Sequence, residues 1–177
     1  MTCHLLIGMI ASGKSTFAQH RARAGDIIVN DDANITAYHG GIYGLYNKQL
    51  KGFYKTIEAN MIMTALAMGL NITIDRTALG AATRMRYISI AKMYGARVVA
   101  VVFPKDTAEI HGTRRFQSDP RGFTLERWLK IAEFHESQWT VPTLAEGMDE
   151  IVYMTHGQLV GLKDQDISLG LSKIGLD

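Results

Sequence analysis

One short segment constrains the fold of this chain more than any other. Residues 8–16 read Gly-Met-Ile-Ala-Ser-Gly-Lys-Ser-Thr and directly follow the apolar run Leu5–Ile7. The pattern G-x-x-x-x-G-K-[ST] between a strand and a helix is typical of a phosphate-binding loop. In such a loop, backbone N–H groups and the positive end of the following helix surround phosphate oxygens. The segment therefore predicts an α/β fold that binds a nucleoside triphosphate.

Individual side chains of this loop have separate expected roles. Lys14 is expected to reach the β- and γ-phosphates, and the Ser15 hydroxyl is placed to bind Mg²⁺. The glycines allow backbone N–H groups to turn toward the phosphates. The candidate nucleotide-binding residues are Gly8, Ala11, Ser12, Gly13, Lys14, Ser15 and Thr16.

Length and composition are those of one ordinary globular domain. The chain has 177 residues, of which 47% are hydrophobic and 20% charged, and its net charge of +2 neither requires nor excludes a nucleic-acid partner. Cys3 is the sole cysteine, so no internal disulfide can form, which favours a reducing, cytoplasmic setting. No apolar run approaches the length of a membrane span, and the N-terminus lacks the basic region of a signal peptide.

Strand and helix patterns alternate along the chain. The expected strands are Leu5–Ile7, Asp26–Val29, Asn71–Ile74, Val98–Phe103 and Glu150–Tyr153, and the expected helices are Ser15–Arg23, Lys48–Met68, Ala82–Tyr94, Thr107–Phe116 and Thr124–Gln138. This alternation predicts a parallel sheet of about five strands with helices on both faces. We expect one domain over residues 1–154, followed by a tail, residues 155–177, whose role is open.

Carboxylates follow two of the predicted strands. Asp31 and Asp32 come just after Asp26–Val29, and Asp75 directly follows Asn71–Ile74. Ligands of a parallel sheet bind beyond the carboxyl ends of its strands. We expect Asp31, on a strand beside that of the phosphate loop, to act as general base, whereas Asp32 is interpreted as a helix cap or turn residue. Asp75 is expected to hold Mg²⁺ through water or to orient the loop, with a simple turn role as the alternative.

The polar segment from Arg114 to Gly122, between two predicted helices, is a candidate lid. Arginines of a mobile lid often neutralise the charge of a phosphoryl group during its transfer. Arg115 and Arg121 are the candidates for this role. The alternative is that these arginines only solvate the end of a helix, where cations are favoured.

An aromatic and glycine-rich segment, Tyr38–Tyr46, interrupts the strand–helix alternation near the candidate base. Aromatic rings in such a position can stack on nucleobases. They can equally pack the segment onto the long helix that follows, and the sequence leaves both interpretations open.

Beyond the phosphate loop, the sequence resembles the kinase domain of polynucleotide 5′-hydroxyl kinases, including the kinase part of animal polynucleotide kinase-phosphatases. The resemblance runs from Leu5 to about Tyr153, and the final stretch Pro-Thr-Leu-Ala-Glu-Gly is its most specific element. The segments that carry it are Val29–Asp31, Ile72–Thr77, Arg84–Tyr87, Arg115–Phe116 and Pro142–Gly147.

The resemblance implies a P-loop kinase fold with a helical lid, ATP as phosphate donor, Mg²⁺ as metal, and the 5′-OH of DNA or RNA as acceptor. By position, Lys14, Ser15 and Thr16 then bind phosphates and metal, Asp31 is the base, and Arg115 and Arg121 belong to the lid.

Three positions depart from the pattern of that family. Asn30 stands where an arginine often precedes the base, Asn34 replaces an arginine that contacts the acceptor's phosphate in a phage member, and Ala78 replaces an asparagine. These departures favour two alternatives to an ordinary 5′-OH acceptor, namely a hydroxymethyl group on a modified base or a small molecule. A nucleotide-dependent switch without phosphoryl transfer is the third alternative.

Overall fold

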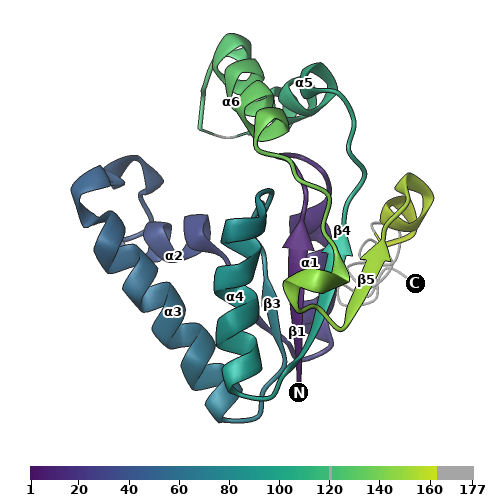
Figure 1. The fold of residues 1–177 in the computed structure, drawn as a ribbon. Helices are drawn as coiled ribbons and strands as arrows, with labels where there is room; N and C mark the ends of the chain where they lie inside the picture. The colour runs from purple at the N-terminus through teal and green to yellow at the C-terminus, as the bar shows by residue number, and fades with distance from the viewer. Residues whose placement is uncertain (120, 163–177) are drawn as a thin grey trace, which may run out of the picture.

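A five-stranded parallel sheet forms the centre of the structure, a computed structural model that describes residues 1–119 and 121–162 (Figure 1). The strands are β1 (Thr2–Ile7), β2 (Ile27–Val29), β3 (Ile72–Ile74), β4 (Arg97–Val102) and β5 (Glu150–Tyr153), in the spatial order β2-β3-β1-β4-β5. The predicted parallel sheet of about five strands is confirmed. β1 begins earlier than the predicted Leu5 because Thr2 already pairs with Arg97 of β4.

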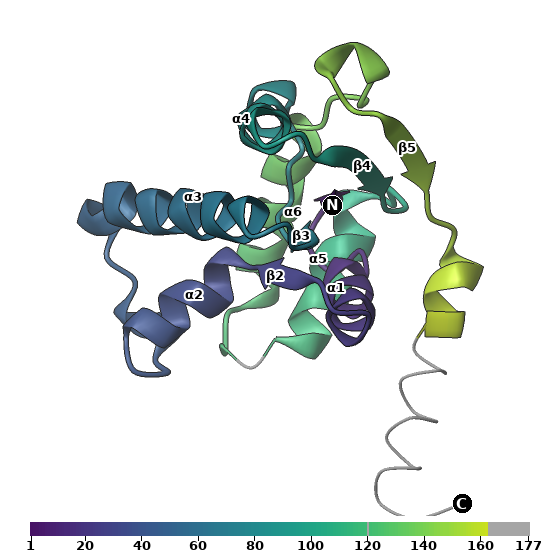
Figure 2. The ribbon, with the colours of Figure 1, turned by 90° about the horizontal axis from the view of Figure 1, so that it is seen from below.

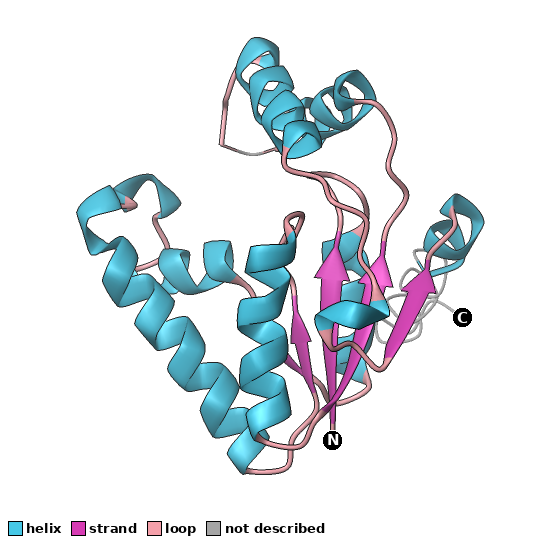
Figure 3. Cartoon of the chain, viewed as in Figure 1, coloured by secondary structure: helices cyan, strands magenta, loops and turns pink. Residues whose placement is uncertain are grey.

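Helices cover both faces of this sheet, as Figures 2 and 3 show. The labelled helices of the fold are α1 (Lys14–Arg23), α2 (Asp31–Tyr38), α3 (Lys51–Ala67), α4 (Ala81–Met93), α5 (Ala108–Ser118) and α6 (Leu125–Ser137), of which α5 and α6 lie beyond the strand ends and not on a face. Alternate residues of β1 serve the two faces: Leu5 packs with α3 and α4, whereas Leu6 packs with α1. Within the described ranges, no helix is long and apolar enough to span a membrane.

The first residues of the predicted tail pack onto the second of these faces. Residues 156–162 are helical, and the Leu159 side chain is buried with Leu6 and Phe103. Residues 163–177 of that tail lie outside the described residues.

The structure corrects the expected place of β2. Its sheet neighbour is β3, through pairs such as Val29 with Ile74, and β3 separates it from β1. Asp31 therefore does not follow a strand beside that of the phosphate loop. The residue in that position is Asp75, at the end of β3.

Helix α2 was not predicted, and it places Asp31 and Asp32 in a first helical turn. Its cap is Asn30, whose side-chain oxygen accepts a hydrogen bond of 2.9 Å from the Ala33 backbone N–H. Acidic residues in a first turn are favoured by the helix dipole. The run Asn-Asp-Asp thus carries a helix-start signal, and Asp32 is not itself the cap.

Helices α5 and α6 stand above the carboxyl ends of the strands and pack against each other (Figure 1). Helix α5 extends to Ser118, two residues beyond its predicted end. Arg114 and Arg115 lie within α5, as in the predicted helix Thr107–Phe116, and the connection between the helices is shorter than predicted. Pro120, within it, lies outside the described residues.

The stretch Pro142–Gly147 is anchored by a fully buried arginine of α4. Arg84 donates hydrogen bonds of 2.7 and 2.8 Å to the two carboxylate oxygens of Glu146 and one of 2.7 Å to the Leu79 carbonyl. It also donates to the Thr140 hydroxyl at 3.0 Å. Through Arg84, this stretch is joined to α4 and to the chain after β3, and these contacts fix the segment that leads into β5.

Candidate functional site

The phosphate loop turns tightly at two glycines. A Cβ atom on Gly8 would lie 2.5 Å from Ser12 Oγ and 3.0 Å from Phe103 Cβ, so any larger residue would force its neighbours to shift. Gly13 caps α1 with a φ of 95°, a conformation that L side chains rarely adopt. The Gly8 backbone N–H also donates to the Thr77 carbonyl at 3.0 Å, which ties the loop to the chain after β3.

Lys14 lies folded inside this loop. Its Nζ donates to the Met9 carbonyl at 2.5 Å and to Ser12 Oγ at 3.3 Å, and its side chain is buried. Burial lowers the pKa of Lys14 to about 8, an effect that the carboxylate of Asp75 opposes and the charge of Arg115 reinforces. Lys14 therefore feels the opposing charges of an acid that follows β3 and an arginine of α5.

Asp75 connects the lysine to the neighbourhood of Asp31. Its buried carboxylate accepts a hydrogen bond of 2.7 Å from Asn30 Nδ2, and its backbone N–H donates to the Val29 carbonyl at 2.9 Å. Asn30 thus caps α2 with its oxygen and holds Asp75 with its nitrogen. This contact brings the ends of β2 and β3 together next to Lys14.

The charge of Asp75 acts on Lys14, and Ser15 follows Lys14 in the sequence. A carboxylate and a hydroxyl are oxygen donors of the kind that Mg²⁺ prefers, and phosphates and water commonly supply its remaining ligands. Ser15 is exposed in the first turn of α1. The residues present fit the metal expected from the sequence.

Asp31, the candidate base, is paired with an arginine that sequence reasoning did not single out. Arg76 Nη1 contacts Asp31 Oδ2 and lies 3.7 Å from Oε1 of the buried Glu58. Asp31 and Arg76 side chains are 28% and 29% exposed, so the pair lies at the rim of the site. Arg76 lies within the resembled segment Ile72–Thr77, but the sequence gave no reason to assign it a role. Its partner Glu58 lies in α3, far from it in the sequence, so the contact is seen only in the folded chain.

The two lid arginines converge on one aspartate and one tryptophan. Asp119 Oδ1 accepts a hydrogen bond of 2.8 Å from Arg121 Nε and lies 3.8 Å from Arg115 Nη2. The guanidinium carbons of Arg115 and Arg121 lie 5.3 and 5.0 Å from the ring centre of Trp128. Arg121 Nη1 also pairs with Asp32 of α2 at 3.4 Å. Both side chains therefore contact Asp119 and Trp128 instead of extending only into solvent.

Two histidines of the lid, missed in the sequence, also belong to this region. Burial, with smaller contributions from Lys14 and His111, lowers the pKa of His135 to about 4. His111 is fully buried, its Nε2 accepts a hydrogen bond of 3.2 Å from the Asp106 backbone N–H, and burial lowers its pKa as well. Both imidazoles are therefore neutral near pH 7. Scattered histidine spacing gave no signal for this arrangement.

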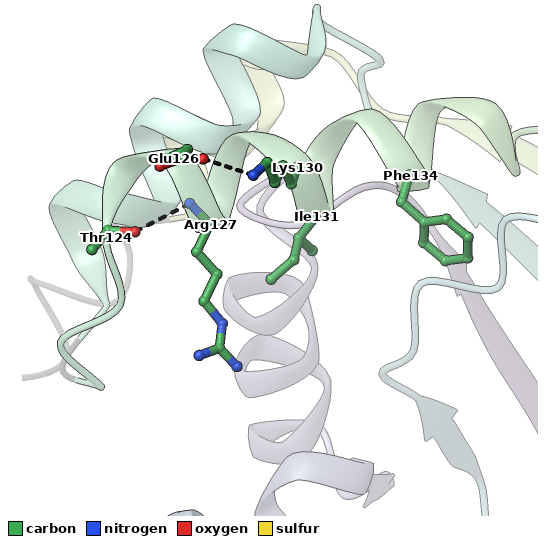
Figure 4. A pocket seen from close by; sticks show the side chains of 6 residues that line it. All are labelled: Thr124, Glu126, Arg127, Lys130, Ile131 and Phe134. Atoms are coloured by element: carbon green, nitrogen blue, oxygen red, sulfur yellow. Dashed lines mark hydrogen bonds and ion pairs between the residues drawn. The ribbon is translucent and has the colours of Figure 1, made fainter.

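A hollow of about 440 Å³ follows the lid helix α6 (Figure 4). The Arg127, Ile131 and Phe134 side chains project from the same side of α6 into this region. Thr124 caps the helix, and Lys130 pairs with Glu126 at 2.6 Å. Since all lining residues come from α6 and its cap, the hollow belongs to the lid and not to the phosphate loop. Its lining residues are Thr124, Glu126, Arg127, Lys130, Ile131 and Phe134.

The aromatic segment after α2 packs onto α3 and remains partly exposed. Tyr38 makes an edge-to-face contact with Phe53, and Tyr46 stacks on Tyr54 with ring centres 5.6 Å apart. Tyr38 and Tyr46 are 41% and 42% exposed. The packing alternative therefore accounts for part of the surface of each residue, and the rest is exposed.

Comparisons with known proteins agree with this architecture. A family model described as an AAA domain matches residues 3–135. Among solved structures, a protein of Chloroflexus aurantiacus assigned as a kinase gives a TM-score of 0.65 at 14% identity, over 89% of this chain and 90% of that one. A gluconokinase from Sinorhizobium meliloti gives 0.55 at 17% identity, over 97% of both chains.

A Pnkp1/Rnl/Hen1 complex gives a TM-score of 0.55 at 22% identity, over 70% of this chain but 43% of the matched one. No curated protein sequence matches the chain significantly. These likenesses show the fold, which is that of P-loop kinases.

Proposed function

The chain belongs to the AAA domain family, and from this membership and its P-loop kinase fold we propose that it transfers the γ-phosphate of ATP to a hydroxyl of a nucleic acid. The simplest acceptor is the 5′-OH end of DNA or RNA. One observation carries the proposal: Asn30, the residue before Asp31, donates a hydrogen bond to Asp75, and the carboxylate of Asp75 acts electrostatically on Lys14. This arrangement supports a site in which the phosphate loop and the candidate base serve one reaction.

Each residue has a defined task in this proposal. Lys14 and the loop N–H groups hold the β- and γ-phosphates, and Asp31 accepts the proton of the acceptor hydroxyl as that oxygen attacks phosphorus. Arg115 and Arg121 stabilise the negative charge on the transferred group. Ser15 and Asp75 would hold Mg²⁺, which supplies charge neutralisation at the phosphates.

A nucleic acid as acceptor is supported by the resemblance around Pro142–Gly147 and by the half-exposed rings of Tyr38 and Tyr46 near the base. Base stacking on such rings tolerates any sequence. We assign the kinase domain to residues 1–154. Residues 155–162 cover α1 through Leu159, which touches the phosphate loop at Gly13.

The test is transfer of label from γ-labelled ATP to 5′-OH oligonucleotides. Asp31→Asn should lower kcat by roughly 10²–10⁴-fold without changing ATP affinity, because only the proton acceptor is lost. Asp32→Asn is the matched control, since it removes the adjacent carboxylate. Intact ATP binding without label on any oligonucleotide would overturn the proposal.

One observation favours a second candidate, a hydroxymethyl group on a modified base or a small-molecule hydroxyl. Asn30, in place of the arginine frequent in the resembled family, is committed to capping α2 and holding Asp75. It therefore contributes no positive charge to the acceptor. Mass spectrometry that locates the new phosphate distinguishes the two, because a phosphate found only at 5′ ends excludes the second candidate.

A further inference from the structure

The chain that joins α2 to α3 forms an arm, residues 38–55, with many large apolar side chains on its surface. It includes the 3₁₀ helices Tyr43–Leu45 and Lys48–Leu50 and the start of α3, and it projects beyond the sheet in Figures 1 and 2. Apolar side chains of the arm that are between 40% and 57% exposed are Tyr38, Ile42, Leu45, Tyr46, Leu50 and Phe53. Such a concentration of exposed apolar groups marks an interaction surface.

A buried tyrosine supports the arm from within. The Tyr54 hydroxyl lies 2.7 Å from His39 Nε2 and accepts a hydrogen bond of 3.3 Å from the Asn47 backbone N–H. The rings of Phe53 and Tyr46 pack on Tyr54, with ring centres 5.9 and 5.6 Å away. The exposed rings are therefore already held in position, which lowers the entropic cost of binding a ligand to them.

The same arm carries positive charge. Residues 33–57 contain no aspartate or glutamate, and the arm exposes Lys48, Lys51 and Lys55. Across residues 1–119 and 121–162, these three lysines form no ion pair. Glu58, the next acid along the chain, is buried and pairs with Arg86 instead. The partner that complements this surface in charge is therefore a polyanion.

A single-stranded nucleic acid fits this surface better than a second copy of the chain or a lipid membrane. In a twofold interface between two arms, the lysines of the two copies would face each other and repel. Surfaces that bind single strands combine positive charge with aromatic rings, because every base has a face that can stack. The arm also continues directly from the helix that begins with the candidate base.

Helix α2 sets the spacing between the arm and that base. Tyr38 follows Asp31 by two helical turns, so the two residues lie on the same side of α2. With a rise of about 1.5 Å per residue, the arm begins roughly 10 Å from Asp31 along the helix. A stacked strand advances by about 3.4 Å per nucleotide, so this distance corresponds to about three nucleotides.

We propose that the arm binds single-stranded nucleic acid of any sequence, beginning about three nucleotides from the reacting hydroxyl. This inference rests on the proposed function, and it names the substrate as a strand of several nucleotides. The three lysines bind phosphates, and the rings of Tyr46 and Phe53 stack on bases. The arm touches no reacting atom, so it determines which acceptors bind and leaves the chemical step to the residues around Asp31.

The first measurement is fluorescence anisotropy with a 3′-labelled twelve-nucleotide oligothymidylate over a range of salt concentrations. The steepness with which log affinity falls against log salt concentration should decrease by about 2 when the three lysines are removed together, because each phosphate contact with a single strand contributes about 0.7. The variant is Lys48→Gln/Lys51→Gln/Lys55→Gln. An unchanged salt dependence in this variant would overturn the inference.

A control variant with the same loss of charge separates the arm from general electrostatics. Lys92, Arg97 and Lys130 lie outside the arm and pair with acids at 2.5–2.6 Å. Lys92→Gln/Arg97→Gln/Lys130→Gln should change the salt dependence by less than about 0.5, because it removes no phosphate contact. An equal decrease in the two triple variants would show that only net charge matters, and the inference would fail.

Substitution of a ring by leucine tests stacking, because leucine stays apolar but offers no aromatic face. Phe53→Leu and Tyr46→Leu should each weaken binding by about tenfold, the effect of losing one stacked base. Tyr153→Leu is the control, since Tyr153 is also exposed but ends β5, and it should leave the affinity within about twofold of wild type. Full affinity in both arm variants would overturn the inference.

The other occupants of the arm give different results. Sedimentation with phosphatidylserine vesicles tests a membrane, and analytical ultracentrifugation tests a second copy. Vesicle binding that requires the three lysines, without binding to the oligothymidylate, would overturn the inference in favour of a membrane. A dimer that dissociates in Phe53→Leu, again without oligothymidylate binding, would overturn it in favour of self-association.

Activity distinguishes this inference from the function on which it rests. With labelled ATP, the kcat/KM of wild type should be about tenfold or more higher for the twelve-nucleotide strand than for a dinucleotide, which ends before the arm. Removal of the three arm lysines should bring this ratio below about threefold and leave kcat/KM for the dinucleotide unchanged. Transfer with a wild-type ratio near one overturns the role of the arm alone. The expected binding pattern without label on any oligonucleotide overturns phosphotransfer and leaves the strand-binding arm.

Discussion

At the scale of single residues, the site contains one buried cation, Lys14, and several ion pairs that are partly exposed. Lys14 is almost fully enclosed by its own loop, so burial dominates its titration. Arg76 and Arg121 instead neutralise acids at the rim of the site. We expect a bound triphosphate to change the environment of Lys14, because its negative charge would replace the contact with the Met9 carbonyl.

Nucleotide binding should therefore take up a proton above pH 8. The pKa of Lys14 is about 8 in the free protein, below its ordinary value of 10.5, and phosphate charge favours the ammonium form. Near pH 9 most of the lysine is neutral and must be protonated on binding, whereas near pH 7 it is already charged. ATP affinity should accordingly fall as the pH rises through 8.

Calorimetry of ATP binding in buffers of different ionisation enthalpy measures this uptake. Lys14→Met serves as the control, because it cannot titrate. Equal proton uptake by wild type and Lys14→Met at pH 9 would show that another group is responsible.

At the scale of elements, the lid couples two parts of the site. Arg115 of α5 adds its charge near Lys14, while Arg121 joins the lid to α2 through Asp32. Trp128 of α6 holds both guanidinium groups, so the two arginines are positioned as a unit. Movement of α5 and α6 would therefore change both the charge near Lys14 and the ion pair with Asp32.

Arg115→Ala and Arg121→Ala should each lower kcat by roughly tenfold to a thousandfold, with a smaller effect on ATP affinity. An interaction made mainly with the transferred group appears in kcat rather than in ground-state binding. Steady-state kinetics with equilibrium ATP binding measures the two. Arg127→Ala is the control, because Arg127 stacks on Phe123 of the lid at 3.6 Å instead. A loss confined to ATP affinity would assign the arginines to ground-state binding.

Periodic elements and turn glycines were readable in the sequence, whereas contacts between distant segments were not. The predicted bounds of β5 are those found, and the run Val98–Phe103 differs from β4 by one residue at each end. Helix α2 was not predicted because its eight residues show too little apolar periodicity. Asn30, a residue type common at helix N-caps, was the one signal of its start. The ion pair of Arg76 with Glu58 and the effect of the Lys14 charge on the pKa of His135 arise only after folding.

At the scale of the whole molecule, the buried Arg84 joins segments that are far apart in the sequence. Its contacts with Leu79, Thr140 and Glu146 hold the chain after β3 against the segment before β5. Removal of one partner from a buried ion pair leaves an uncompensated charge, which costs much more than the loss of an exposed pair. The family-like stretch around Glu146 is therefore expected to matter for stability.

Arg84→Ala should lower the free energy of unfolding by about 3–5 kcal/mol. Lys92→Ala, which breaks the exposed pair with Asp149, should cost less than about 1 kcal/mol. Urea denaturation followed by circular dichroism measures both. A similar loss of unfolding free energy in the two variants would contradict the role of Arg84 in joining these distant segments.

The contribution of Glu146 should disappear in acid. The hydrogen bond from Arg84 holds the pKa of Glu146 below its ordinary value of 4.5. A depressed carboxyl pKa contributes stability that is fully present above 4.5 and is lost as the pH falls through the folded-state value. The stability difference between wild type and Glu146→Gln should therefore shrink below pH 4.5, as urea denaturation across the acid range will show. A constant difference would point to packing instead.

The strand order has a consequence for the stereochemistry of the proposed reaction. Because β3 separates the strand of the phosphate loop from the strand before Asp31, the phosphate loop and Asp31 follow different strands. In the proposed reaction, the two substrates would therefore be bound at once, with the hydroxyl on the side of phosphorus opposite the leaving group. A single displacement of this kind inverts the configuration of a chiral γ-phosphorothioate. Two successive transfers through an enzyme-bound phosphate would retain it.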